Sequence, residues 1–246
     1  MSRKTQKKNI SRKIGKFRGD RRVIGLLALF AALIAAWSWL EAHPEDNPWA
    51  PLDLRHPIGM ATAGKLAALK DDVELCRVTL ERSEVEFRAL EGTGNAACER
   101  PDRTQLDNYP LAPDTPSVTC PVAAALELWR TKSVAPAAQT IFGSELSRIE
   151  HLGAYSCRRL YGREEGAWSE HASANAIDIS AFVLTDGTRI SVLDDWDEGG
   201  DKARFLREVR GGACNVFATV LSPDYNAAHA NHFHFDQQGR WSGVCR

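Results

Sequence analysis

The chain has 246 residues, of which 43% are hydrophobic, and a net charge of −1. This length gives room for one substantial domain plus an attachment segment. The charge is unevenly spread, because residues 1–22 contain ten Lys or Arg against one acid, whereas the rest has 21 basic and 31 acidic residues. We expect no nucleic-acid partner, since membrane topology explains so short a basic tail better than nucleic-acid binding does.

Residues 23–40 form an uncharged run that ends in Trp-Ser-Trp-Leu. A helix of this length nearly crosses a hydrocarbon core of about 30 Å. Because the basic cluster precedes the run, the positive-inside rule predicts a single-pass inner-membrane protein with a cytoplasmic N-terminus and a periplasmic main domain. The alternative is a cleaved signal peptide, but the basic region is long for one and no small-residue cleavage site follows.

Composition divides the chain into four segments. Several prolines and the lack of a periodic pattern after the apolar run predict a stiff spacer there. The predicted segments are a basic cytoplasmic tail (1–22), a transmembrane anchor (23–40), a linker (41–69) and the main domain (70–246).

All six cysteines follow the apolar run. An even number confined to the exported part predicts disulfides in an oxidising compartment. A cysteine zinc site is disfavoured because the sequence has no CxxC pair. The pairing is open from sequence, and we expect the near-neighbour set, Cys76–Cys98, Cys120–Cys157 and Cys214–Cys245.

The first half of the main region mixes helix, strand and loop signals. Thr62 is a candidate cap for a short helix through Lys70. The polar–apolar alternation of residues 73–90 predicts paired strands, although parts of it are compatible with helix. Residues 92–116 are rich in Gly, Pro, Asp and Asn, which predicts a loop, and Pro121 opens a predicted helix.

The second half is richer in strand signals. Asp186-Gly187 is a hairpin turn signal, and an apolar face over residues 202–220 predicts a helix that Pro223 ends. Short apolar or β-branched runs predict strands at 146–155, 176–184, 188–193 and 232–236. Together these elements predict an α+β domain with a small antiparallel sheet flanked by helices.

Histidines gather near two of these strands. His232 and His234 would share one face of a strand because side chains alternate with period two, and Asp178 would project from another strand. Two imidazoles and a carboxylate that converge can hold a catalytic zinc ion with a fourth position open. An isolated His-x-His is also common as an ordinary surface or core pair, so residue type and spacing alone leave metal binding open.

Two segments resemble zinc peptidase motifs. Residues 169–178, SEHASANAID, resemble the SxHxxGxAxD signature of zinc D-alanyl-D-alanine carboxypeptidases and dipeptidases, with Ala174 where glycine is usual. Residues 229–234, HANHFH, resemble the HxxHxH motif of penicillin-insensitive murein endopeptidases. Residues 70–246 as a whole resemble the bacterial extensin-like C-terminal domain family, through CPVAAALELW, YSCRRLYG, SEHASANAIDISAF and HFHFD.

The resemblance implies a D-Ala-D-Ala metallopeptidase-like fold and a role for each histidine of the motifs. His232 matches the endopeptidase histidine that assists a zinc-bound water, and His229 matches a further active-site histidine. The three zinc ligands that the resemblance implies are His171, Asp178 and His234.

The carboxypeptidases carry a glutamate at the position of Asn231, so their usual carboxylate base is missing here. Arg158 and Ser169 are candidate substrate-binding groups, although a surface ion pair would equally explain Arg158. The leading hypothesis is a zinc-dependent hydrolase acting on peptidoglycan peptides in the cell envelope. The alternatives are a catalytically inactive wall- or envelope-binding domain that retains the metal and a disulfide-bonded structural domain without metal.

Overall fold

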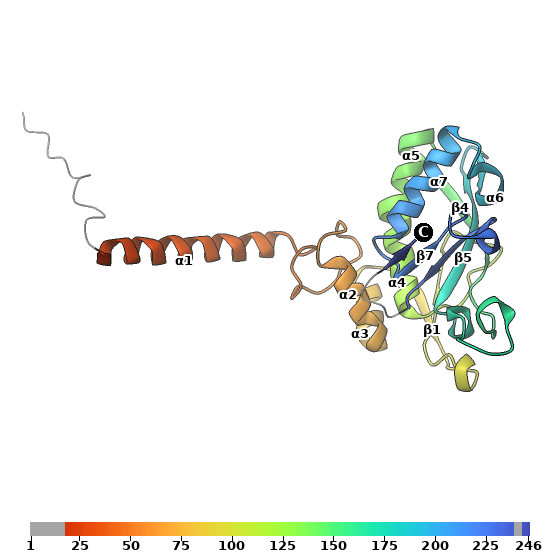
Figure 1. Ribbon diagram of the computed structural model, residues 1–246, viewed down its shortest axis with the longest axis horizontal. Coiled ribbons are helices and arrows are strands. Elements are labelled where there is room, and N and C mark those ends of the chain that lie inside the picture. Colours follow the sequence, from red (N-terminus) through yellow and green to blue (C-terminus); the bar gives the residue numbers. More distant parts are fainter. Residues whose placement is uncertain (1–17, 239–242) are drawn as a thin grey trace, which may run out of the picture.

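The computed structural model describes residues 18–238 and 243–246. It opens with α1 (Arg18–Ala42), a single helix that extends away from the body of the molecule (Figure 1). Within Gly19–Ala42, an 18-residue window has a mean hydropathy of 2.3 and none of that window is buried, so the helix is long and apolar enough to be a membrane span or a signal sequence. Most of the predicted basic tail, residues 1–17, lies outside the described residues.

Part of the predicted linker packs into the body. Leu52 and Leu54 belong to the hydrophobic core. The backbone N–H of Leu54 donates to Ser83 Oγ at 2.9 Å, and Arg82 Nη1 donates to the carbonyl of Leu52 at 3.0 Å. The packed body therefore begins about twenty residues before the predicted domain start at residue 70.

The prediction of paired strands over residues 73–90 is wrong for most of that segment. Residues Val73–Arg82 form helix α3, which Asp72 caps by accepting the Leu75 N–H at 2.9 Å. The residues of α3 that face the core follow helical spacing, and this burial outweighs the local alternation. Only β1 (Phe87–Leu90) is a strand, and it pairs antiparallel with β2 (Arg103–Leu106) inside the predicted loop.

The main sheet has the strand order β3-β4-β5-β8-β7-β9, with β6 paired to β5. Its central pairs are antiparallel, as predicted, but β3 pairs with β4 and β7 with β9 in parallel, so the sheet is mixed. The strands are β3 (Leu111–Ala112), β4 (Leu146–Gly153), β5 (Ala176–Leu184), β6 (Arg189–Ser191), β7 (Thr219–Leu221), β8 (Phe233–Asp236) and β9 (Val244–Cys245).

Helices cover one face of this sheet (Figure 1). The predicted helix at Pro121 is α4, with proline in its first turn as expected. The helices after α1 and α3 are α2 (Thr62–Ala68), α4 (Cys120–Trp129), α5 (Ala135–Phe142), α6 (Val192–Asp195) and α7 (Gly200–Ala213), with a π-helical segment at Arg130–Val134 between α4 and α5.

The predicted helix over residues 202–220 ends earlier than expected. Helix α7 stops at Ala213, and Thr219–Leu221 joins the sheet as β7. Val220 is fully buried and pairs with Phe235 of β8, so sheet pairing overrides the apolar periodicity that predicted helix there. The predicted strand 188–193 is likewise shorter, because Ser191 caps α6 by accepting the Asp194 N–H at 3.3 Å.

All six cysteines are disulfide-bonded, which confirms the expectation that they would pair. The near-neighbour pairing is right for Cys214–Cys245 and wrong for the other four cysteines. Packing of α3 against α4 joins Cys76 to Cys120, and packing of the 3-10 turn Ala96–Cys98 beside residues 170–173 joins Cys98 to Cys157.

Candidate metal centre and the histidine cluster

The central strand pair sets two of the predicted ligands side by side. In the antiparallel pairing of β5 and β8, Asp178 lies directly opposite His234. Residues directly opposite one another in a strand pair project on the same face of the sheet. The flanking residues Ile177, Ile179 and Phe233 point to the other face and are fully buried in the core.

The third residue comes from a 3-10 turn, Glu170–Ser173, that leads into β5. Ser169 caps this turn and its Oγ accepts the His171 N–H at 3.3 Å. Ala174 ends the turn with φ 58°, in the left-handed region that favours glycine. The resemblance has glycine at this position, so the backbone conformation explains the usual residue, and alanine adopts it here.

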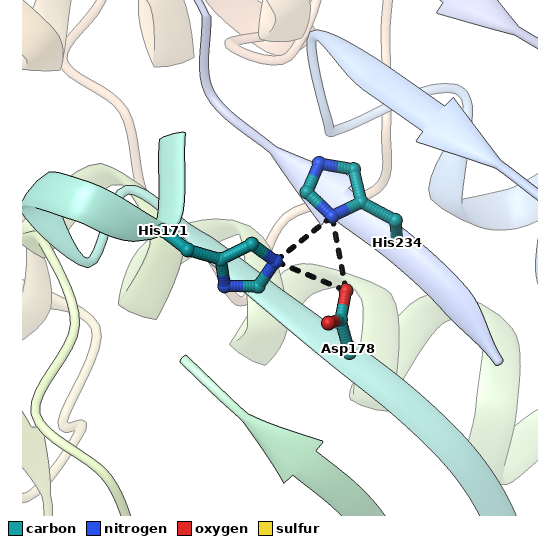
Figure 2. A group of neighbouring side chains, drawn as sticks. All are labelled: His171, Asp178 and His234. Carbon is teal, nitrogen blue, oxygen red and sulfur yellow. Dashed lines mark hydrogen bonds and ion pairs between the residues drawn. The ribbon is translucent and has the colours of Figure 1, made fainter. Parts of the chain in front are cut away.

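The three side chains meet at one point (Figure 2). Asp178 Oδ1 lies 2.9 Å from His234 Nδ1 and 3.2 Å from His171 Nε2, and the two imidazole nitrogens are 3.1 Å apart. All three residues are buried or partly buried. Residues separated by up to 63 positions in the sequence are thus brought into contact by the sheet and the turn.

The outer nitrogens of both imidazoles are tied to acceptors. His171 Nδ1 donates to the carbonyl of Ala154 at 2.9 Å, and His234 Nε2 donates to Asp236 Oδ2 at 3.1 Å. In the neutral imidazoles, the inner nitrogens therefore carry lone pairs. Two lone pairs and a carboxylate oxygen converge within about 3 Å, an arrangement that repels itself unless a cation lies among them.

The pKa shifts of His234 and Asp178 also show that the cluster favours a positive charge. Burial disfavours the charged form of His234, but hydrogen bonds to Asp178 and Asp236 outweigh it and raise the pKa of His234 to about 9. Burial also opposes ionisation of Asp178, yet the hydrogen bonds from His171 and His234 lower its pKa well below the usual range. The carboxylate is thus ionised at neutral pH, as a ligand must be.

The donor set fits zinc. Zinc bonds to histidine nitrogen and carboxylate oxygen are about 2.0–2.2 Å long, which places tetrahedral ligand atoms about 3.3 Å apart. The three observed separations, 2.9, 3.1 and 3.2 Å, are close to that value. The carbonyl of Ala154 and the carboxylate of Asp236 hold the rings in the manner of outer-shell partners of metal ligands.

Two further histidines adjoin this centre. His232 lies just before β8, half-buried, with Nε2 3.6 Å from Asp178 Oδ1. Its Nδ1 donates to Asn231 Oδ1 at 2.8 Å, so Nε2 is free to accept a proton. Burial lowers the pKa of His232, more strongly than the nearby Asp178 raises it.

His229 follows the same pattern. It ends the 3-10 turn Ala227–His229, its Nδ1 donates to Asn226 Oδ1 at 2.8 Å, and its ring lies 5.2 Å from that of His232. Burial, followed by the charge of His232, lowers the pKa of His229 to about 4. Both histidines are therefore neutral at pH 7, with an acceptor nitrogen each.

The two residues predicted to bind substrate differ in their exposure and in their contacts. Arg158 is exposed and makes no side-chain ion pair with the described residues, and its charge reaches His232, whose pKa it helps to lower. Ser169 is buried, and its hydroxyl is the cap that orients the His171 turn. A contact of either residue with substrate stays a prediction.

The sequence did not indicate the groups that fix the histidine tautomers. No role was predicted for Asn226 or for the carbonyl of Ala154, and Asn231 stood out only as a missing glutamate. A signal did exist for two of them, because an asparagine three residues before His229 and one directly before His232 are within local hydrogen-bonding reach.

The model of the extensin-like protein C-terminus family matches residues 74–246. The chain belongs to this family. The matched region contains all of the cluster and begins just inside α3, so the extensin-like part of the chain includes every strand of the sheet. Comparison with curated proteins and with solved structures gave no match.

Proposed function

We propose that this extensin-like protein is a zinc-dependent hydrolase that cleaves the peptide part of peptidoglycan in the cell envelope. The observation that carries the proposal is the meeting of His171 Nε2, Asp178 Oδ1 and His234 Nδ1 within 3.2 Å, with both outer imidazole nitrogens bound to acceptors. Such a set favours a positive charge at its centre, which either a proton on His234 or a metal ion supplies, and zinc takes this donor chemistry.

Likeness to zinc peptidases supports the choice of reaction. The residues that meet are those that match the ligands of the carboxypeptidase signature and the last histidine of the endopeptidase motif. A D-Ala-D-Ala metallopeptidase-like arrangement of the sheet is part of this proposal. When bound, zinc would polarise the scissile carbonyl and lower the pKa of water.

The chain's own residues supply the proton transfers. His232 is neutral, and Asn231 leaves its Nε2 as an acceptor close to Asp178 Oδ1. We assign His232 to take a proton from the attacking water and to return it to the leaving amine, with His229 beside it as a second neutral acceptor. Asn231, at the position of the peptidase glutamate, thereby orients the base.

We propose that Arg158 holds a carboxylate of the substrate. It is exposed, is unpaired among the described residues and acts electrostatically on His232. A guanidinium binds a carboxylate through two parallel hydrogen bonds. Stem peptides of peptidoglycan carry such carboxylates.

The proposed location is the periplasmic side of the inner membrane. Helix α1 would be the anchor, and the excess of Lys and Arg before it would keep the N-terminus in the cytoplasm. Three disulfides in the remainder suit an oxidising compartment.

One observation favours a second candidate, an inactive envelope-binding domain that retains the metal. The carboxylate base of the carboxypeptidases is absent, because Asn231 cannot accept and deliver a proton. In that case the zinc site would hold a ligand or support the loops, and no bond would be cleaved.

The test is digestion of purified sacculi by the zinc-loaded full-length chain in detergent, followed by muropeptide analysis. We expect new peptide ends, loss of turnover with retained zinc in His232→Ala, and loss of zinc in His234→Ala. His56→Ala, outside the cluster, is the control and should keep both. Zinc bound without any muropeptide release would exclude the hydrolase and favour the binding domain, and a wild-type chain that binds no zinc would exclude both.

A further inference from the structure

Beside the histidine cluster, exposed aromatic side chains line a rim. The rim consists of the loop of residues 154–168, which joins β4 to the His171 turn, together with Tyr225. Tyr161 is 58% exposed, Trp168 40% and Tyr225 38%. Large aromatic side chains left in solvent together mark interaction sites more often than they occur by chance.

The rim is continuous with the proposed metal centre. The ring of His229 lies 6.0 Å from that of His234 and 5.4 Å from that of Tyr225. Asn226, which directly follows Tyr225, donates from Nδ2 to the Tyr161 hydroxyl at 3.4 Å, so the tip of the loop contacts the segment that carries Tyr225 and His229. At the base of the loop, Trp168 directly precedes Ser169, the cap of the His171 turn.

The loop is held in a defined shape. The Leu160 N–H donates to the carbonyl of Ala167 at 3.0 Å, Arg159 and Trp168 form a β-bridge, and Cys157 is bonded to Cys98. Tyr161 at the tip has φ 57°, a left-handed conformation that is unfavourable for a bulky residue. Keeping tyrosine at a position that favours glycine indicates a use for its exposed ring.

Two of the aromatic rings of the rim have an arginine guanidinium beside them. The guanidinium of Arg159 lies 4.4 Å from the centre of the Trp168 ring, and that of Arg163 lies 5.7 Å from the Tyr161 ring. With Arg158 the loop has three arginines against Glu164 and Glu165, whereas the chain after residue 22 has 31 acids and 21 bases. The rim is therefore locally basic on an acidic protein.

We propose that this rim binds the glycan strand of peptidoglycan and thereby presents the attached peptide to the histidine cluster. The inference deepens the function proposed above and rests on it. The C–H face of an amino sugar packs on an exposed aromatic ring, whose polar end hydrogen-bonds the hydroxyl and amide groups. The free carboxylates of this polymer lie on its stem peptides, because the lactyl carboxylate of each alternate sugar is bound in the amide link to its peptide. The arginines beside Trp168 and Tyr161 match these carboxylates where the peptide leaves the strand. Binding of a free peptide would not require these exposed aromatic rings.

The test uses glycan strands freed of peptide by an amidase, so that binding does not depend on cleavage. Affinity of the full-length chain in detergent is measured with zinc and with a chelator. We expect binding in both conditions and a loss of about tenfold in Tyr161→Ala and in Trp168→Ala. Trp49→Ala is the matched control, since Trp49 is 77% exposed outside the rim, and should bind as the wild type does.

The outcomes separate this inference from the hydrolase proposal. Wild-type chain that does not bind naked glycan, or that binds it equally well in both rim variants, overturns the rim assignment even if sacculi are cleaved. Rim variants that lose affinity for free stem peptide but not for glycan would transfer the surface to the peptide and also overturn it. Tyr161→Ala lies at an exposed loop tip, so an unchanged circular dichroism spectrum and melting temperature would show that its loss of binding is not unfolding.

Discussion

The two faces of the β5–β8 strand pair have opposite chemistry. On one face, Phe233 and Phe235 are fully buried, and Phe235 lies 5.1 Å, edge to face, from the ring of Trp129. On the other face, the intervening positions hold His234 and Asp236, which are linked by a hydrogen bond. One strand of four residues thus contributes to the core and to the candidate metal centre in alternation.

The contrast shows how the hydrophobic core on one face of the strand pair can fix the positions of the polar side chains on the other face. Aromatic rings and aliphatic side chains on the helix-covered face fix the strands, and the period of two then fixes where the ligands project. Among the described residues, turns and loops contact the cluster face through single hydrogen bonds and through the ring contact of Tyr225 with His229. We therefore expect core changes to reduce stability whether or not zinc is present, and cluster changes to act through zinc.

The largest effect should come from the core face. Phe235→Ala removes a fully buried ring that contacts Trp129 and Phe217, and should lower the free energy of unfolding by about 3–5 kcal/mol. Denaturant unfolding of the full-length chain measures it. A loss below about 1 kcal/mol would show that the helix-covered face is not what holds the strand pair.

Zinc should stabilise the protein only through the cluster. At free zinc about 1,000 times the dissociation constant, the wild type should gain about 4 kcal/mol, and His234→Ala and Asp178→Ala should gain nothing. The Phe235→Ala variant should have a lower free energy of unfolding than the wild type, but zinc should raise that free energy by the same amount if the variant folds. Thermal unfolding with and without zinc measures all four proteins. A gain that survives in Asp178→Ala would place the zinc elsewhere.

The sequence predicted elements that depend on contacts between neighbouring residues better than elements that depend on contacts between residues far apart in the chain. Strand β5 has the bounds that its run predicted, because all of its residues except Ser180 are buried and, apart from Asp178 and Ser180, all are apolar. Helix α3 and the end of α7 were mispredicted where tertiary packing decides: Val220 reads as an apolar helix position but is paired in the sheet. Two of the three disulfides were mispaired for the same reason, since they join elements 44 and 59 residues apart.

The candidate site divides in a similar way. Residue types and motif resemblance were enough to select His171, Asp178 and His234, which the structure brings together. The hydrogen bonds that set each tautomer were not predictable, because the carbonyl of Ala154 comes from a loop that no pattern places beside His171. Ser169, a candidate substrate-binding residue, is also a cap, which follows from its place at the start of a turn, and its contact with substrate stays a prediction.

A smaller effect is expected from the partner of His234. Asp236→Asn removes the charge that accepts the His234 Nε2–H, and should weaken zinc binding about ten- to hundredfold while leaving the ion bound at high concentration. Calorimetric titration of zinc measures the change. Asp195→Asn is the control, because this buried carboxylate accepts from Ser191 and pairs with Lys202 away from the cluster. Equal weakening in both variants would indicate a general loss of order.

The smallest effect should distinguish a serine that only caps a turn from a serine whose cap also positions a zinc ligand. Ser169→Ala and Ser191→Ala each remove a hydroxyl that accepts a backbone N–H at 3.3 Å, and each should lower the free energy of unfolding by about 1 kcal/mol. Only Ser169 orients the turn that carries His171, so zinc affinity should fall in Ser169→Ala and stay constant in Ser191→Ala. Denaturant unfolding and zinc titration on the same two proteins test this. If Ser169→Ala lost stability but no zinc affinity, the position of His171 would be set by its bond to the Ala154 carbonyl and not by the cap.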